Sequence, residues 1–312
     1  MSRRSERNEF EQPADSGRQP HPDTVRRPES DSRERDVRGT SSGPAQAQRD
    51  HLRDSEPIQQ RPAEPRTLYR DQHWTYSLRT SEIQTLRELG TFRAIDSEAL
   101  TEIGYRGERD RMEQDLRNLV RQSLITRQPI EGPERERMHV LTLTKAGQRF
   151  LRKQTLMPKE RPIYHGLVKL KEARHDATLY RLYHKAARKI ESDGGKVRTV
   201  ALDCELKKRI NRELSRLGAD RHNGNKKIEI AHAHAVRVVN GRVVVPDLQV
   251  EYETAEGHMA RVNLELATKN YRAGHLQAKA QAGFILYAPA QDSDRLRRVL
   301  NDREITAEIL SL

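Results

Sequence analysis

Two acids and two lysines in the C-terminal third of the chain have the residue types and spacing of a metal-dependent phosphate site. Asp247 follows Pro246 directly after a run of valines, and Glu265 lies within the next alternating segment. Carboxylate oxygens suit Mg²⁺, or Mn²⁺ in its place, because Mg²⁺ keeps several waters and shares its coordination with substrate phosphate. Such a metal can supply a hydroxide and stabilise developing charge, while a lysine neutralises the phosphate. We therefore expect Asp247 and Glu265 to be metal ligands, and Lys269 and Lys279 to complete the catalytic set.

Strand alternation decides whether these side chains share a surface. The segments 242–253 and 259–269 are predicted strands, and successive side chains of a strand point to opposite faces. Glu265 and Lys269 then share one face of the second strand. Asp247 shares a face of the first with Gln249, Glu251 and Glu253. Neighbouring strands would bring these carboxylates together, but an amphipathic sheet with one solvated face gives the same alternation, so both interpretations stay open.

Histidines offer two weaker candidates. His232 and His234 are two residues apart on a predicted strand, 228–238, where two imidazoles on one face can bind a transition metal. No third ligand has a familiar spacing, which favours surface or hydrogen-bonded histidines. His175, beside Asp176 at the start of a long helical segment, could reach the face that carries the acids. Tyr271 and Tyr287 are interpreted as packing residues.

The elements upstream have the order of a winged helix-turn-helix, predicted for residues 78–154. Apolar residues at helical spacing predict a first helix from about Thr80 and a second from Asp96 to Gly104. They also predict a third that carries Met112, Leu116, Leu119 and Val120. Strands at 124–125 and 140–143 flank a polar loop with Gly132-Pro133, and a helix from 145 to 151 closes the unit.

That order places the third helix in the major groove of DNA. The expected DNA contacts, from this helix, the turn before it and the hairpin, are Arg106, Arg109, Gln114, Arg117, Arg121, Arg127, Arg135 and Arg137. Arginines of the hairpin suit phosphate oxygens. Ordinary solvated charges, or a winged helix that binds protein, remain the alternatives.

Charge is distributed unevenly along the 312 residues. Hydrophobic residues make up only 34% and charged residues 33% of the chain, so part of it cannot be packed core. Residues 1–65 hold 12 Arg, no Lys and 13 acidic residues, a balance of −1, and their composition predicts a disordered tail. The remaining residues hold 46 basic and 33 acidic side chains, a balance of +13, which favours a polyanionic partner such as double-stranded DNA.

Other features limit the class of protein. A single cysteine, Cys204, excludes an internal disulfide framework and a cysteine-rich zinc site. No apolar run approaches the roughly 18 residues of a membrane span, and the N-terminus lacks the apolar core of a secretion signal. We expect a cytoplasmic protein with no membrane partner. Residues 152–165 are predicted as a linker, and residues 166–312, where helices and strands interleave, as an α/β domain with a mixed sheet.

Read together, residues 78–300 resemble the replication-relaxation family of plasmids and integrative elements. The resemblance depends on RMEQDLRNLVRQSLI and LTLTKAGQRFL in the first half. In the second half it depends on His175-Asp176, then VVVPD, then LELATKNYRAGHLQAK. It implies a winged helix joined to a domain similar to PD-(D/E)xK nucleases. In the usual nuclease motif a lysine stands two residues after the acid, where this chain has Ala267. Lys269 or Lys279 could take its place.

The resemblance implies a DNA-binding protein of a mobile element, active in plasmid replication or mobilisation, with Mg²⁺-dependent endonuclease or nickase chemistry. The alternative is a transcriptional or copy-number regulator whose C-terminal domain is an inactive oligomerisation or binding module. A scaffold without nucleic acid is disfavoured by the positive balance. The tail could recruit other replication or mobilisation proteins, and a homodimer is compatible with the sequence.

Overall fold

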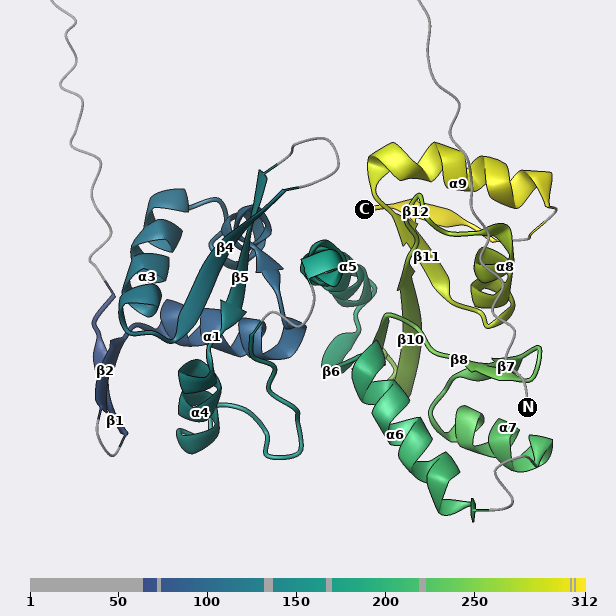
Figure 1. Cartoon of the computed structure of the whole chain (residues 1–312), viewed down its shortest axis with the longest axis horizontal. Helices are drawn as coiled ribbons and strands as arrows, with labels where there is room; N and C mark the ends of the chain where they lie inside the picture. Colours follow the sequence, from purple (N-terminus) through teal and green to yellow (C-terminus); the bar gives the residue numbers. More distant parts are fainter. Residues whose placement is uncertain are drawn as a thin grey trace, which may run out of the picture. The chain divides into compact units, whose positions relative to one another are not determined.

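Helices and strands interleave along the chain, which confirms the predicted α/β class with a mixed sheet (Figure 1). The computed structural model describes residues 64–71, 74–131, 137–166, 170–218, 223–303, 305 and 307–312. The predicted tail, apart from Glu64 and Pro65, and the hairpin residue Arg135 lie outside the described residues. Everything below concerns the unit formed by residues 60–312.

The N-terminal half of this unit contains the predicted succession of three helical segments, two strands and a closing helix. A hairpin that was not predicted, β1–β2, precedes them. The elements are β1 (Thr67–Asp71), β2 (Trp74–Leu78), α1 (Thr80–Phe92), β3 (Ile95–Asp96), α2 (Ser97–Ala99), a π-helical turn (Leu100–Gly104), α3 (Arg109–Arg121), β4 (Ile125–Glu131), β5 (Arg137–Leu143) and α4 (Lys145–Lys153). Strands β3, β5 and β4 form an antiparallel sheet in that order, and β1 pairs only with β2 among the described strands.

Helix α3 forms because apolar side chains recur every three or four residues. Met112, Leu116 and Leu119 are buried, as the spacing predicts. The expectation for Val120 is wrong, since its side chain is 44% exposed. The packed side of α3 instead also contains Asp115 and Asn118, two buried polar residues.

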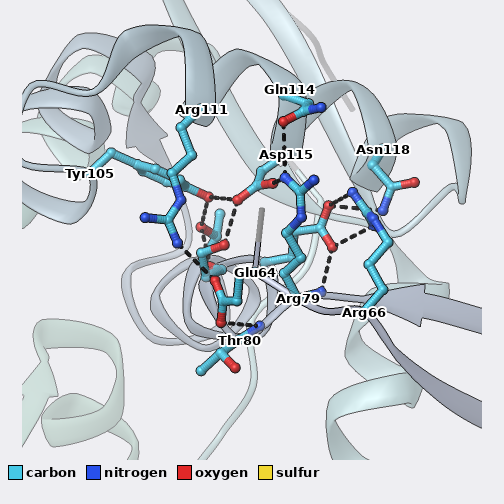
Figure 2. Close-up of polar contacts among 12 residues, drawn as sticks. Glu64, Arg66, Arg79, Thr80, Tyr105, Arg111, Gln114, Asp115 and Asn118 are labelled. Atoms are coloured by element: carbon cyan, nitrogen blue, oxygen red, sulfur yellow. Dashed lines mark hydrogen bonds and ion pairs between the residues drawn. The ribbon is translucent and has the colours of Figure 1, made fainter. Parts of the chain in front are cut away.

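A buried polar network joins α3 to β2 and α1 (Figure 2). Asp115 accepts hydrogen bonds from Arg79 Nη1 at 2.9 Å, Ser81 Oγ at 2.6 Å and the Tyr105 hydroxyl at 3.1 Å. Glu82, with 0% exposure, accepts from the backbone N–H of Arg79 and from Asn118, and Arg66 donates to both of its oxygens. These acids are buried with their partners, which is the condition under which buried charge is tolerated.

The C-terminal half contains a five-stranded sheet in the order β12-β11-β10-β9-β6. Strands β10, β11 and β12 are parallel, while β9 runs antiparallel to both of its neighbours. The elements are α5 (Leu170–Ser192), β6 (Lys196–Leu202), α6 (Asp203–Arg216), α7 (Gly224–Ala233), β7 (Arg237–Val239), β8 (Arg242–Val244), β9 (Leu248–Glu253), β10 (Met259–Leu266), α8 (Ala273–Gln281), β11 (Ile285–Ala288), α9 (Ala290–Asp302) and β12 (Ile309–Ser311).

Apolar side chains cover both faces of this sheet. Leu179 and Leu182 of α5 belong to the same buried cluster as Leu248 and Leu264, on one face. Leu276 of α8 and Leu296 of α9 pack with Leu286 and Ile309 on the other, and Figure 1 shows α8 and α9 beside β11 and β12. The register of β9 and β10 is fixed because each strand has one apolar face and one polar face, and a slip by one residue would exchange them.

Several predicted boundaries in this half are wrong. Residues 224–233 form helix α7, not the first part of a strand at 228–238, and only Arg237–Val239 are extended. The predicted strand 242–253 is divided into β8 and β9 around Pro246, which has no N–H to donate to a sheet. Strand β10 ends at Leu266, three residues short of the predicted end. The hairpin turn predicted at Asn240-Gly241 is confirmed, and both residues have positive φ.

Candidate functional site

Strands β9 and β10 bring the two predicted acids together. The antiparallel register pairs Gln249 with Asn263 and Leu248 with Leu264, so Glu265 lies beside the start of β9. Glu265 Oε2 accepts the backbone N–H of Asp247 at 3.1 Å, and Asp247 Oδ2 accepts the backbone N–H of Leu266 at 2.9 Å. The two strands are thus neighbours, the condition under which the sequence places these carboxylates together, and each carboxylate is hydrogen-bonded to the strand end that carries the other.

Glu265 is completely buried and has two further partners. Lys279 Nζ lies 2.6 Å from its Oε1, and the Tyr271 hydroxyl donates to the same oxygen at 2.6 Å. Lys279 also donates to the carbonyl of Val245 at 2.8 Å, which fixes its ammonium group over the strand end. Burial, and then the charge of Asp247, raise the pKa of the Glu265 carboxyl, and Lys279 opposes both.

Asp247 is paired with His175 from α5. His175 Nε2 lies 3.2 Å from Asp247 Oδ2, and its Nδ1 lies 3.9 Å from Asp176. Burial acts to lower the pKa of His175, but the carboxylates of Asp176 and Asp247 outweigh it and raise the pKa to about 10. Burial likewise acts to raise the pKa of Asp247, but the hydrogen bond and charge of His175 hold it below the usual value. At neutral pH, His175 is therefore a cation beside an ionised Asp247.

A third cation stands close to the pair. Lys207 of α6 binds Asp203 at 2.7 Å, and the backbone N–H of Asp203 donates to the carbonyl of Asp247 at 3.0 Å. Burial acts to lower the pKa of Lys207, and Asp203 outweighs it and raises that pKa, with smaller contributions from Asp247 and Glu265. Neither Lys207 nor Tyr271 was predicted to belong to the site. The spacing of Asp203 and Lys207 by four residues was the available signal for Lys207. Tyr271 does pack against the apolar cluster that contains Leu276, as expected, and its hydroxyl in addition binds Glu265.

The carboxylate oxygens of Asp247 and Glu265 that still have room for a partner are suited to a hard divalent cation. An ionised carboxylate can accept about four hydrogen bonds, two at each oxygen. Oδ2 of Asp247 and Oε1 of Glu265 each have two partners, whereas Oε2 of Glu265 has one and Oδ1 of Asp247 accepts none from the described residues. Two oxygens are thus available to a cation such as Mg²⁺, which takes one or two carboxylates and completes its coordination with water and phosphate. No group of three or more His, Cys, Asp or Glu side chains suited to holding a metal occurs in the described part of the chain.

The two candidate lysines are placed differently. Lys279 contacts Glu265, as described above. Lys269 is exposed beyond the end of β10, where its backbone N–H donates to Asp292 at 3.1 Å. The expectation that Lys269 shares the face of Glu265 is wrong, because strand alternation stops at Leu266. Ala267, at the position of the usual nuclease lysine, is completely buried in an apolar cluster.

The polar face of β9 and β10 continues away from the acids as paired side chains. Gln249 donates to Asn263 at 2.9 Å, and Arg261 lies 3.4 Å from Glu251. Glu253 pairs with Arg198 of β6. Glu251 and Glu253 are therefore partners of arginines and lie outside the Asp247–Glu265 pair.

The strand predicted to carry His232 and His234 is wrong. His232 belongs to α7, and His234 follows the end of that helix, so the two do not share a strand face. His234 Nε2 instead lies 2.9 Å from Glu213. These histidines form no metal site together.

The residues predicted to contact DNA differ in their solvent exposure and in whether another side chain already binds them. Arg106, Arg117, Arg121 and Arg137 are exposed, and Arg109 is exposed while paired with Glu98. Figure 2 shows Gln114 with its amide oxygen bound to Arg79, at 3.0 Å, which leaves the amide N–H groups for a ligand. Arg127 is half-buried against Glu113 at 2.7 Å, so it positions the sheet against α3.

Comparison with known proteins adds no relative: no protein-family model, curated protein or solved structure matches this chain. No helix in the described part of the chain is both long enough and apolar enough to cross a membrane.

Proposed function

We propose that this chain is a DNA-binding protein of a mobile genetic element, acting in plasmid replication or mobilisation, that cuts or nicks DNA with a divalent metal. In this proposal the N-terminal half is a winged helix that locates double-stranded DNA. The C-terminal half is a PD-(D/E)xK-like domain that acts on the phosphodiester. The observation that carries the proposal is the Asp247–Glu265 pair, with Lys279, His175 and Lys207 around it.

Asp247 and Glu265 would hold the metal. Mg²⁺ or Mn²⁺ there would supply a nucleophilic hydroxide and stabilise the charge that develops on the phosphate. Lys279 and Tyr271 keep Glu265 oriented, because both donate to its Oε1. The N–H groups of Asp247 and Leu266 hold the two carboxylates at fixed positions on the strand ends.

The cations around the acids have a separate role. His175, Lys279 and Lys207 place three positive charges about two carboxylates, with Asp203 and Asp176 as outer partners of Lys207 and His175. A phosphate that enters the site would contact these positive charges. The contacts would replace most of the hydrogen bonds with water that the phosphate loses on entry. A cationic His175 next to Asp247 can also donate a proton to a departing oxygen.

The exposed side of α3 and the hairpin β4–β5 would contact the duplex. Arg109, Gln114 and Arg117 reach base edges in this proposal, and Arg137 reaches phosphate. The positive balance of residues 66–312 supports a polyanionic partner.

A second candidate is a transcriptional or copy-number regulator whose C-terminal half has lost its chemistry. The observation that favours it is the internal neutrality of the site, where the ammonium of Lys279 and the imidazolium of His175 already balance both carboxylates. Ala267 at the position of the usual nuclease lysine favours it too.

Cleavage of supercoiled plasmid DNA in Mg²⁺ or Mn²⁺ separates the two candidates. Asp247→Asn retains an oxygen for the N–H of Leu266 but removes the charge, so it should bind duplex DNA like the wild type and cut none. Glu251→Gln, on the same strand and paired with Arg261, is the matched control and should cut normally. If the wild type cuts no DNA in either metal and Asp247→Asn matches it in melting and binding, the regulator takes the place of the nuclease.

A further inference from the structure

The hairpin β1–β2 presents a side chain that neither the acidic site nor the surface of α3 accounts for. Trp74, the single tryptophan of the chain, is 66% exposed although it lies on the packed side of β2. Tyr76 and Leu78 follow it at alternate positions and are buried. The ring of Tyr76 packs edge-on against that of Phe150 in α4, with 5.2 Å between the ring centroids. The core stops before Trp74, so the indole forms the wall of an open hollow.

The hollow has a volume of about 360 Å³. Besides the hairpin residues, it is lined by the end of α3 and the start of α4, through Arg121, Gln122, Ser123, Ala146 and Arg149. Its size is near the lower limit of small-ligand pockets, about 300–1,000 Å³, which suits one planar ring with its substituents.

Positive charge surrounds this aromatic wall. Arg149 is loosely paired through Nε with Asp71 at 3.7 Å, and neither of its Nη atoms donates to a described residue. Asp71 is buried and has Lys153 as a second partner. Arg121 donates to Asn118 at 2.8 Å and is otherwise exposed. Arg121, Arg149 and Lys153 carry three positive charges, and Asp71 carries one negative charge. Positive charge is therefore in excess near the indole.

We propose that this hollow binds an unstacked nucleobase of single-stranded DNA. Trp74 supplies the face on which the base stacks, and the guanidinium groups of Arg121 and Arg149 take the adjoining phosphates. Stacking on an aromatic residue beside a basic groove is how sequence-independent single-strand binders hold a strand. The site rests on the proposed function for its partner, because α3, whose exposed side would contact duplex DNA, ends at the hollow.

Trp74 reports on its own site, since no other tryptophan contributes to the emission. Titration of the full chain with oligo(dT) should quench the tryptophan fluorescence to saturation. With a labelled oligo(dT) followed by anisotropy, Trp74→Ala should weaken binding roughly 5- to 150-fold, the range for loss of one stacked base. Arg149→Ala should weaken it as well, and Trp74→Phe should retain most of it.

Leu68→Ala is the matched control. Leu68 belongs to the same hairpin and has the same 66% exposure, but it does not line the hollow. Its loss should leave oligo(dT) binding unchanged. Equal affinities for wild type and Trp74→Ala, or binding with no change in emission, would overturn the proposal.

Binding of duplex DNA, measured in parallel, distinguishes a failure of the nucleobase site from a failure of the proposed function. If duplex binds and oligo(dT) does not, the nucleobase site fails while the proposed function stands, and a peptide becomes the better occupant of the hollow. If oligo(dT) binds and quenches while duplex does not, the nucleobase site stands and the assignment of α3 to duplex DNA fails.

Discussion

Glu265 accepts the backbone N–H of Asp247, and Asp247 in turn accepts the backbone N–H of Leu266, the residue that follows Glu265. Two like charges this close are normally kept apart, because each raises the pKa of the other. Here a lysine and a cationic histidine stand beside them, Lys279 on Glu265 and His175 on Asp247. The pair is thereby held in a geometry that a metal and a phosphate could use.

Removal of Lys279 should destabilise the fold. Lys279→Met leaves Glu265 buried without its charge partner, which costs about 3–5 kcal/mol. The loss should shrink as the pH falls, because a protonated Glu265 needs no cation. Urea unfolding at several pH values measures both effects. Lys269→Met, at an exposed position, is the control and should stay within about 0.5 kcal/mol of wild type. Equal losses for the two lysines would contradict the assignment of Lys279.

Because of His175, the free energy of unfolding should fall as the pH becomes alkaline. Its folded pKa, about 10, is above the ordinary 6.5, so the folded state binds the proton more tightly than the unfolded state. The stabilisation is complete below about pH 6.5 and is lost as the pH rises towards about 10. His175→Asn should flatten this decline. If denaturation curves of wild type and variant decline equally over that window, His175 is not the paired cation.

The network beneath α3 should contribute strongly to stability. Asp115→Ala leaves the guanidinium of Arg79, with only 10% of its side chain exposed, without its carboxylate partner. We expect a loss of about 3–5 kcal/mol in the free energy of unfolding. Ser81→Ala removes one hydrogen bond to the same carboxylate, for about 1 kcal/mol. Chemical denaturation compares the two, and similar losses would mean that the ion pair adds little.

Substitutions on α3 should separate base recognition from phosphate binding. Arg109→Ala and Gln114→Ala should each weaken a preferred duplex by roughly 1–3 kcal/mol. Arg137→Ala should weaken all duplexes similarly and reduce the salt dependence. Arg298→Ala, on the exposed side of α9, should change nothing. Uniform losses from the two α3 variants across sequences would remove the case for sequence recognition.

Local patterns predicted most of the elements that surround the site. Apolar spacing predicted α1, α3 and α5, and alternation predicted the strands that contain β9 and β10, whose pairing the structure supplies. Helix α7 was missed because the run from Ile228 to His234 alternates like a strand. Two features favour the helix there: Asn223 caps its first turn by accepting from the N–H groups of Asn225 and Lys226, and Ala231 packs in one cluster with Leu206 and Ile210.

The site itself was only half predictable. Asp247 and Glu265 were found because one follows a valine run and Pro246 and the other lies within the next alternating segment. The choice between Lys269 and Lys279 depended on where β10 ends and where α8 packs, and both are tertiary properties. Tyr271 and Lys207 lie in a loop and on a helix whose positions relative to the strands are not encoded in local spacing. The buried Asp115 likewise looks, in the sequence, like any other polar residue of an amphipathic helix.

The proposed nuclease chemistry depends on a divalent cation binding to Asp247 and Glu265, and calorimetric titration of the protein with Mn²⁺ tests this binding most directly. We predict one saturable site in the wild type, its loss in Asp247→Asn, and its retention in Glu251→Gln. The same heat of binding in wild type and Asp247→Asn, or no binding in the wild type, would contradict the proposed metal site.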